Sequence, residues 1–455
     1  MCFFQHEHDE VFLSQTFCQR AKTILHLGIP MIIAMVSQSL LNLVDAALVG
    51  PLGKNALAAV GAGSNALLVA LAFVAGVSSG VQAQVARRMG TQLTHCAATP
   101  VNHGMVIAFV FGLPVSIFLC LIAPWIMQVY QVDPATKVDA LLYFQIRVMT
   151  LTAAVLNLAF RGYWNGTRQP HCFLKNLLIS HLFNAAASYC LIYGKADLPA
   201  LGVAGAAIGT FLSMYLCALL NLYDLRRCAL HHGLFTRWGN RLAFFRLIKL
   251  ATPDSVQQVL FSLAIMLFFV IISYLGAEAI AISHVLISLS LFLILPGLGL
   301  GVSVTTLVSQ SLGASKPDEA LQWGKDGVVV AIIVLIVLGL PFILAPNFFL
   351  SWFFHDDHLL MLARLPLQLL CLGIIIDTAA LVLSRALLGA GANRSVLVIR
   401  FFFQWCVLLP LVWLVGPVLG WGLSAVWGVQ ALQKFLSSLT FIIVWHQKRW
   451  IEIDI

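Results

Sequence analysis

The chain has 455 residues, of which 60% are hydrophobic and 10% charged, with a mean hydropathy of +0.95. Soluble domains contain about 45–50% apolar and about 25% charged residues, and no polar segment of domain size interrupts this chain, so a soluble enzyme is excluded. The net charge of +8 is spread between apolar runs rather than gathered on one polar face, which argues against nucleic-acid binding. The composition predicts an integral membrane protein.

Motifs for catalysis, metal binding or secretion are not recognisable in the sequence. The ten Cys form no CxxC pair, so neither a metal site nor a disulfide framework is predicted. No HExxH motif or phosphate-binding loop occurs, which argues against an enzyme and against a bound cofactor. The first twenty residues contain Glu7, Asp9 and Glu10 before any apolar run, a pattern that does not predict a cleaved signal peptide.

Twelve apolar runs of about 20 residues, the length of a transmembrane helix, follow one another along the chain. Their approximate centres are Leu41, Val69, Ile107, Val155, Phe183, Phe211, Phe261, Leu293, Leu335, Ile376, Leu408 and Leu436. The breaks coincide with turn sequences such as Gly50-Pro51-Leu52-Gly53, Asn165-Gly166-Thr167 and Gly416-Pro417. Because the runs show no period-two alternation, we predict an all-α integral membrane protein with twelve transmembrane helices rather than a β-barrel.

Lys and Arg are distributed unequally between the two sides of this predicted bundle. One side holds twenty of them and the other five, with Lys434 inside the last span. The five are Lys54, Lys137, Arg147, Lys195 and Arg364. Because basic residues accumulate on the cytoplasmic side of membrane helices, we expect a multi-pass protein of the inner (cytoplasmic) membrane with both termini in the cytoplasm.

An internal repeat becomes visible when the sequence is compared with itself at an offset of 223 residues. Segment 30–90 then matches segment 253–313 without gaps at 13 of 61 positions. The coinciding residues include Pro30 with Pro253, Gly53 with Gly276, Gly76 with Gly299 and, at the same offset, Gly166 with Gly389. We therefore predict two six-helix lobes, residues 1–227 and 246–455, joined by a cytoplasmic linker at 228–245. Six spans per lobe give both lobes the same orientation, so a parallel pseudo-two-fold repeat relates them, as in many transporters.

An acid in the middle of a transmembrane helix is costly unless it faces water or a partner, so it marks a candidate functional site. Asp45 lies well inside the first span, and Asn42 and Gln38 precede it by three and seven residues, which places all three on one helix face. Such a polar stripe is expected to point into the lobe or its cavity, where the carboxyl group can alternate between a charged and a neutral form. The alternative is a buried Asp that serves the structure alone.

A second acid, Asp377, lies within the tenth span. It corresponds to Ala154 in the repeat, whereas Asp45 corresponds to Phe268, so the lobes share a scaffold but not a pattern of charges. Asp377 is a candidate to couple ions or to bind a cationic substrate, with a structural hydrogen bond as the alternative. Lys434 is a candidate substrate contact, or a lysine that pairs or snorkels within the bundle.

Pro30 precedes Asp45 by fifteen residues in the same span. A proline inside a helix produces a fixed kink, or it provides a hinge at which the span bends when the charge of Asp45 changes. The sequence leaves these two interpretations open.

Taken in chain order, these features resemble the multidrug and toxic compound extrusion (MATE) family of cation-coupled antiporters, most closely its DinF-like branch. The matching segments are Gln38-x-x-x-Asn42-Leu43-Val44-Asp45, Arg161-Gly162-x-x-x-Gly166-Thr167, Gln310-Ser311-Leu312-Gly313-Ala314 and Arg385-x-x-x-Gly389-x-Gly391. The resemblance covers nearly the whole chain. It implies efflux of amphipathic, often cationic, drug-like compounds in exchange for inward H⁺ or Na⁺.

The resemblance also implies a site for the coupling cation in the N-terminal lobe. The residues that match the family's first-span Asp, fifth-span Asn and sixth-span Thr are Asp45, Asn184 and Thr210. Ser188 occupies the position of an acid in DinF-like members, a departure that places the coupling on Asp45. Asp377 matches the tenth-span Asp of the NorM branch, but Phe261 stands in the region of that branch's seventh-span Glu. We therefore expect no complete Na⁺ site in the second lobe.

We expect an antiporter that couples to H⁺ rather than Na⁺, works as a monomer in the lipid bilayer, and binds neither a cofactor nor nucleic acid. The alternative on the same scaffold is a lipid-linked oligosaccharide flippase, whose cavity needs several inward Arg or Lys; here only Lys434 is a candidate. A membrane-embedded enzyme or a channel is the alternative from another class, and would need clustered catalytic residues or a lined pore.

Overall fold

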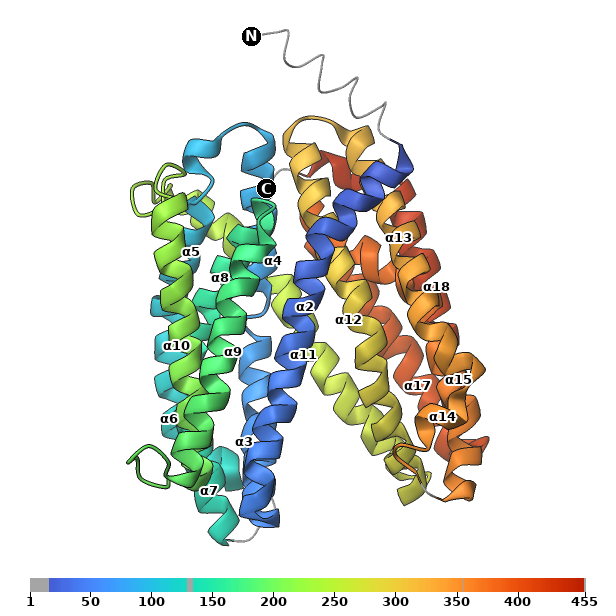
Figure 1. Cartoon of the computed structure of the whole chain (residues 1–455). Helices are drawn as coiled ribbons and strands as arrows, with labels where there is room; N and C mark the ends of the chain where they lie inside the picture. The colour runs from blue at the N-terminus through green and yellow to red at the C-terminus, as the bar shows by residue number, and fades with distance from the viewer. Residues whose placement is uncertain (1–15, 129–133, 355, 454–455) are drawn as a thin grey trace. The chain divides into compact units, whose positions relative to one another are not determined.

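The computed structural model describes residues 16–128, 134–354 and 356–453, so the segment on which the signal-peptide prediction rests lies outside the described residues. Within these ranges the secondary structure consists of helices, without a β-strand (Figure 1). Ten helices are long and apolar enough to cross a membrane, and α7 and α8, which are bent by 41° at a short break, form an eleventh span of the described chain. Helices suit this composition because they satisfy every backbone hydrogen bond without water.

The twelfth span is α9, Pro170–Tyr193. Its 24 residues rise about 36 Å at 1.5 Å per residue, enough to cross a bilayer core of about 30 Å. The helix is less apolar than its neighbours because one of its faces carries polar side chains that are buried in the protein. All twelve centres expected from the sequence fall in helical segments, and the predicted all-α membrane fold is confirmed.

The first six spans are built from consecutive helices, some of them broken. Their bounds are α2 Phe17–Val49, α3 Lys54–Ala72 with α4 Gly76–Gly90, α5 Thr99–Ile107 with α6 Leu113–Gln128, α7 Pro134–Val148 with α8 Leu151–Gly166, α9, and α10 Gly202–Cys228. A π-helical turn at Ala108–Gly112 joins α5 to α6.

The last six spans repeat this order with fewer breaks. Their bounds are α11 Arg241–Ser273, α12 Ala277–Gly313, α13 Pro317–Leu344 followed by the short α14 Pro346–Leu350, α15 Asp357–Ala390, α16 Asn393–Phe401 with α17 Leu409–Trp413, and α18 Gly422–His446. Two π-helical segments, Phe402–Leu408 and Leu414–Val418, flank α17.

The internal repeat is visible in backbone geometry. α2 and α11 each contain 33 residues with a proline inside. Gly53 and Gly276 precede α3 and α12 with φ of 106° and 104°, a conformation that a residue with a side chain rarely adopts. Gly166 and Gly389 lie where two helices nearly touch, because an added Cβ would be 3.0 Å from the Gln82 carbonyl oxygen and 2.5 Å from that of Thr305, respectively. Gln82 and Thr305 are themselves 223 residues apart, so the repeated glycines serve equivalent helix contacts.

The chain forms two compact units that differ slightly from a division at the linker. One contains Ile33–Val259, and the other contains Leu260–Ile455 together with the described part of Met1–Ile32. α2 and α11 therefore each contribute their first residues to one unit and the remainder to the other. We call the unit of Ile33–Val259 the first lobe and the other unit the second lobe.

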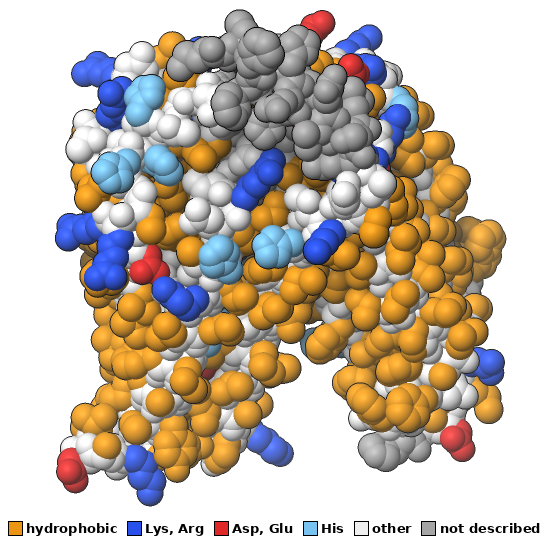
Figure 2. All heavy atoms as spheres, turned by 45° about the horizontal axis from the view of Figure 1, so that its top comes forward, with side chains coloured by type: hydrophobic (Ala, Val, Ile, Leu, Met, Phe, Trp, Pro, Cys, Tyr) orange, Lys and Arg blue, Asp and Glu red, His pale blue; other side chains and the backbone are white. Residues whose placement is uncertain are grey.

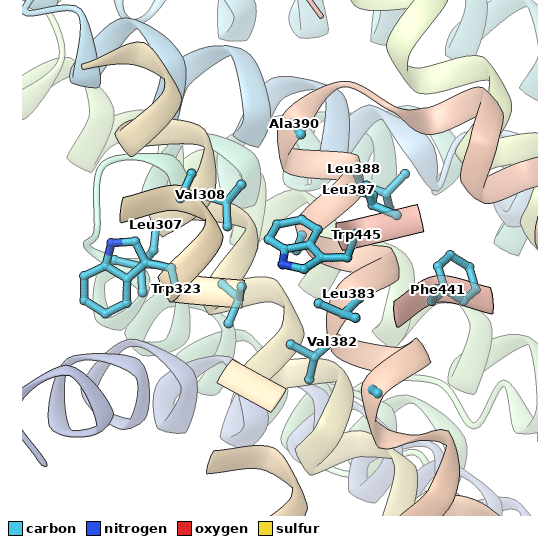
Figure 3. Packing of buried hydrophobic residues seen from close by; sticks show 14 of the residues in the cluster. Leu307, Val308, Trp323, Val382, Leu383, Leu387, Leu388, Ala390, Phe441 and Trp445 are labelled. Carbon is cyan, nitrogen blue, oxygen red and sulfur yellow. The ribbon is translucent and has the colours of Figure 1, made fainter. Parts of the chain in front are cut away.

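Each lobe has its own apolar interior. In the second lobe, Leu307 and Val308 of α12 and Trp323 of α13 pack with α15 and α18 residues that include Leu387 and Trp445 (Figure 3). In the first lobe, a corresponding cluster joins α4, α5 and α8 around Val81, Phe160 and Trp164. The outer helix faces are apolar as well, and Lys, Arg and His side chains gather toward one end of the helices (Figure 2). A surface of this kind suits contact with lipid.

Candidate functional site

One face of α9 carries a row of buried polar side chains. Asn176, Ser180, Asn184 and Ser188 follow one another at intervals of four residues and are exposed by no more than 2%. This spacing places them along one side of the helix. We call them the α9 polar row.

The α9 polar row is hydrogen-bonded to α10. Asn184 Nδ2 donates to Ser213 Oγ at 3.1 Å, and Ser188 Oγ donates to Asn184 Oδ1 at 3.4 Å. Toward the start of α9, Asn176 Nδ2 donates to Asn221 Oδ1 at 3.3 Å. Because an unpaired polar group is costly in an apolar interior, the bonds from Asn184 to Ser213 and from Asn176 to Asn221 hold α9 and α10 in register.

Ser188 lies at the closest approach of α9 and α10. It is fully buried, and a Cβ added to Gly209 would lie 2.9 Å from the Ser188 Cα. The small size of both residues permits this contact. A longer acidic side chain at position 188 would need the two helices to separate, so the absence of the DinF-like acid agrees with the packing.

Asp45 lies near the end of α2 and is half-buried. The Thr210 hydroxyl lies beside its carboxylate, and the Arg147 guanidinium acts on the carboxylate as the neighbouring cation. Asp45 Oδ1 is buried and finds no hydrogen-bond partner within the described chain, as is also true of Nε and Nη1 of Arg147. The Asp45 carboxylate thus retains an unused acceptor in the interior of the first lobe.

The sequence analysis did not find Arg147 as a site residue. Arg147 was counted among the five basic residues of the side opposite the termini; it lies in the last turn of α7, next to the 41° bend between α7 and α8. The Tyr215 hydroxyl donates to the Met149 carbonyl at this bend, at 3.1 Å. No Pro or Gly marks the break. The sequence feature that could have identified Arg147 as a site residue is its position between apolar segments.

A small cavity lined by both polar and apolar side chains lies between α2, α9 and α10. It is lined by Gln38, Leu41, Leu177, Ser180, His181, Thr210, Ser213, Met214 and Cys217. Its volume of about 20 Å³ is enough for a water molecule. Of the predicted site residues, only Gln38 and Thr210 line it, and Asn42 is exposed. His181, whose Nδ1 is buried without a partner among the described residues, is a lining residue that the sequence analysis missed.

In the second lobe Asp377 is 7% exposed, and its Oδ1 is buried without a hydrogen-bond partner in the described chain. Two cations act on it, Arg400 of α16 and Lys434 of α18. Arg400 Nη2 donates to the Ala380 carbonyl at 3.1 Å and to Ser384 Oγ at 3.2 Å. Asp377 and Lys434 were predicted from the sequence as candidate site residues, whereas Arg400 was not.

Two further acids are buried in helices that extend beyond the expected spans. Asp254 of α11 is 5% exposed and accepts a hydrogen bond from Ser79 Oγ at 2.6 Å. Asp326 of α13 is 4% exposed and accepts one from Arg20 Nε at 2.5 Å. Each bond joins two helices of one lobe, so both acids have a structural explanation.

Pro30 lies inside α2, which is one continuous helix from Phe17 to Val49. It stands two residues before Ile32, the last residue of α2 that belongs to the second lobe. A change of direction in α2 near Pro30 would therefore occur where the helix passes from one compact unit to the other.

The MatE family model matches residues 30–190 and 253–414. The chain belongs to the MatE family. The two matches begin at residues 30 and 253, the offset of 223 residues that defines the internal repeat, and the family resemblance noted in the sequence is confirmed. Assignment to the DinF-like branch stays a prediction.

Two proteins named as multidrug resistance proteins are similar to this chain over nearly its whole length. "Multidrug resistance protein NorM" of Burkholderia vietnamiensis is 25% identical over 436 residues, covering 92% of each chain. "Probable multidrug resistance protein NorM" of a Synechococcus strain is 26% identical over 449 residues, covering 94% of each.

Solved structures agree with the fold. A MOP superfamily transporter from Pyrococcus furiosus, for which a binding pocket of reverse polarity and a different function are described, has a TM-score of 0.87 at 19% identity. The match covers 96% of this chain and 97% of that one. A MATE transporter in complex with MaL6 has a TM-score of 0.86 at 19% identity, covering 94% and 96%.

Family membership decides the class of protein. MatE family members are multi-pass membrane transporters, not enzymes, and they work without a cofactor. Among the described residues no three His, Cys, Asp or Glu side chains are grouped so as to hold a metal ion. The polar groups around Asp45 in the first lobe and around Asp377 in the second lobe are therefore candidate sites for transported ions and cargo.

Proposed function

We propose that this MatE family member is a multidrug efflux antiporter that exchanges amphipathic drug-like compounds for H⁺, with Asp45 as the coupling acid. The observation that carries the proposal is the half-buried Asp45 carboxylate, whose Oδ1 is left without a partner in the described chain beside Thr210. The relatives named as multidrug resistance proteins supply the class of cargo.

The surroundings of Asp45 favour H⁺ over Na⁺ as the coupling ion. A sodium ion needs several oxygen ligands to replace its water shell, as in channel filters. Two oxygens between α9 and α10 are already engaged, because Asn184 Oδ1 accepts from Ser188 and Ser213 Oγ of α10 accepts from Asn184. The Arg147 guanidinium also repels a second cation, whereas a proton forms a covalent bond to the carboxylate and needs no such shell.

The proposed cycle links protonation to the shape of α2. Protonation of Asp45 from the extracytoplasmic side removes its attraction to Arg147 and allows its carboxyl group to donate a hydrogen bond. The carboxyl group and Thr210 then rearrange against α10, and α2 bends near Pro30, where it passes between the lobes. In this scheme Asn184, Ser188, Gln38 and Asn42 supply the surrounding hydrogen bonds, and cargo is released outward.

We further propose that the protein lies in the cytoplasmic membrane as a monomer, with both termini in the cytoplasm. Support comes from Arg87 and Arg88 in the last turn of α4 and from Arg226 and Arg227 in the last turn of α10, since basic residues accumulate at cytoplasmic helix ends. The functional division proposed is that of the repeat, with lobes at 1–227 and 246–455 joined by the linker 228–245.

The proposal is tested in proteoliposomes loaded with tetraphenylphosphonium and driven separately by a pH gradient or a Na⁺ gradient. We expect pH-driven transport in the wild type and its loss in Asp45→Asn, because the amide cannot carry the proton. Asp139→Asn is the matched control, since Asp139 is an exposed acid of α7 in the same lobe. Retained pH-driven transport in Asp45→Asn would refute the role of Asp45. Transport driven by Na⁺ at clamped pH would refute the choice of ion.

A flippase for lipid-linked oligosaccharides remains the second candidate, because the second lobe presents two interior cations rather than one. Arg400 joins Lys434 beside Asp377, and a pyrophosphate carrier needs several such cations. Rescue of cell-wall synthesis in a flippase-deficient bacterium, without drug resistance, would favour this candidate over drug efflux.

A further inference from the structure

We propose that the second lobe contains a binding site for the anionic group of an amphipathic cargo, built around Lys434. The inference rests on the transporter function proposed above and names a class of cargo for it. The ligand chemistry is a carboxylate or phosphate attached to an apolar body.

Lys434 faces the interior of the second lobe. On α18 it shares a helix face with Trp427, Ser438 and Phe441, which lie seven residues before it and four and seven residues after it, and all three are buried. Its side-chain stem packs against α15, where a Cβ added to Gly373 would lie 3.4 Å from Lys434 Cδ. The lysine therefore does not extend along the lipid-facing side of α18, where Phe435 and Leu439 are exposed.

The face of α15 that contacts Lys434 also carries Asp377 and the residues that bind Arg400. Gly373, which contacts Lys434, lies one turn before Asp377, and Ala380 and Ser384, which bind Arg400, lie one and two turns after it. These α15 residues share one side of the helix by their spacing. Asp377 therefore lies between the two basic side chains along α15, so the group contains one acidic and two basic residues.

Of the two cations, Arg400 is already held by the protein. Its guanidinium donates to the Ala380 carbonyl and to Ser384 Oγ and lies 5.1 Å from the centre of the ring of Phe441, a residue of α18 that is labelled in Figure 3. The Lys434 ammonium has neither a hydrogen-bond nor an ion-pair partner within the described part of the chain. The charge of Asp377 acts on this ammonium, but its three donors have no acceptor in the described chain and can be satisfied by an oxyanion.

Neighbouring donors on α18 are also unused. Ser437, one turn after Lys434, is fully buried, and its hydroxyl has no partner among the described residues; the same is true of the Trp427 indole Nε1, two turns before Lys434. An indole donates only, and a hydroxyl can donate. The buried side of α18 therefore offers an ammonium and a hydroxyl within one turn for an acceptor-only group, with an aromatic ring nearby for an apolar body.

The experiment measures how ligands of matched shape shift the thermal unfolding midpoint of the purified full-length protein in detergent. The probes are 1-naphthoate, its cationic counterpart 1-naphthylmethylammonium, and farnesyl diphosphate. Binding to the folded state raises the midpoint in proportion to the logarithm of ligand concentration over Kd. Wild type and the variants Lys434→Met, Lys434→Arg and Lys325→Met are compared. Lys325 is an exposed lysine of α13 in the same lobe and serves as the control.

We expect at least one anion to stabilise the wild type, Lys434→Arg and Lys325→Met. The Kd of this anion for Lys434→Met should be at least tenfold higher than for the wild type. 1-Naphthylmethylammonium should bind Lys434→Met no more weakly than it binds the wild type. A dependence seen with 1-naphthoate identifies a carboxylate cargo, and one seen only with farnesyl diphosphate identifies a lipid phosphate. Equal anion binding in wild type and Lys434→Met, or no anion binding at all, would overturn the site and leave Lys434 as a structural partner of Asp377.

The result is separable from the test of the proposed coupling mechanism. Asp45→Asn should lose pH-driven transport while anion-dependent stabilisation persists, because Asp45 belongs to the first lobe. If Asp45→Asn transports normally but Lys434→Met loses anion binding, the coupling proposal fails and the anion site stands.

Discussion

Equivalent helices of the two lobes carry very different interiors. In the first lobe, α9 presents the neutral residues Ser180 and Asn184 to α10. At the 223-residue offset these positions hold Phe403 and Val407, in the π-helical segment that follows α16. The second lobe instead places three charges on α15, α16 and α18. The repeat therefore preserves helix contacts, such as those of Gly166 and Gly389, whereas the polar and charged residues of the interior differ between the two lobes.

The two acids illustrate the same difference. The repeat mate of Asp45 is Phe268, which packs edge-on against Trp427 at a ring distance of 5.9 Å in an apolar cluster. The mate of Asp377 is Ala154, which is buried in α8. Each acid thus lies where the other lobe is apolar. One is expected to carry the transported proton, and the other to balance fixed cations.

The largest expected effect on stability comes from Asp377→Asn. Removing this carboxylate leaves Arg400 and Lys434 without their balancing charge, and loss of one member of a buried charge group costs about 3–5 kcal/mol. Asp45→Asn is expected to change the unfolding midpoint far less, because Asp45 is only half-buried, whereas Asp377 is 7% exposed. Thermal unfolding of both variants in the same detergent checks this order; an equal loss in both would remove the distinction between a balancing and a coupling acid.

A smaller effect is expected from Asn184→Val, which gives the first lobe the apolar residue found at the equivalent position of the second. Ser213 and Ser188 each lose a hydrogen-bond partner inside the membrane region, which costs about 1–3 kcal/mol. The unfolding midpoint should fall, whereas Asn65→Val, at an exposed site of α3, should leave it unchanged. An Asn184→Val protein as stable as the wild type would show that the α9 polar row does not hold α9 to α10.

The smallest effect concerns pH and the linker of the first lobe. The Tyr163 hydroxyl is hydrogen-bonded to His232 Nδ1 at 2.6 Å, and burial, with the charge of His231, lowers the pKa of His232 from its usual 6.5. The folded state therefore favours neutral His232. Its contribution is complete above pH 6.5 and is lost as the pH falls through the lowered folded-state pKa.

The expected loss is about 1 kcal/mol, the net worth of one hydrogen bond. It should appear as a fall in the unfolding midpoint below pH 6.5 that is weaker in His232→Gln than in the wild type. His171→Gln, at an exposed site of α9, should keep the wild-type pH profile. If the unfolding midpoint falls equally with pH in all three proteins, the acid sensitivity comes from groups other than His232.

The sequence by itself determined the membrane class, the spans and the repeat. Apolar runs long enough to cross a bilayer must become helices there, because no water is available to bond the backbone. Special residues such as Gly53 and Gly276 recur because their backbone geometry is needed twice. The same reasoning identified Asp45 and Asp377, since an acid in such a run is conspicuous.

Only the tertiary structure decided which polar residues meet. It placed Arg147 and His181 in the interior of the first lobe and Arg400 beside Asp377, whereas none of the three was predicted as a site residue from the sequence. It also left Asn42 exposed, although its spacing matched that of Gln38 and Asp45. Periodicity assigns a residue to a helix face, but what that face contacts depends on helix breaks and neighbouring helices. These are set by packing contacts between residues far apart in the chain, and no local pattern records them.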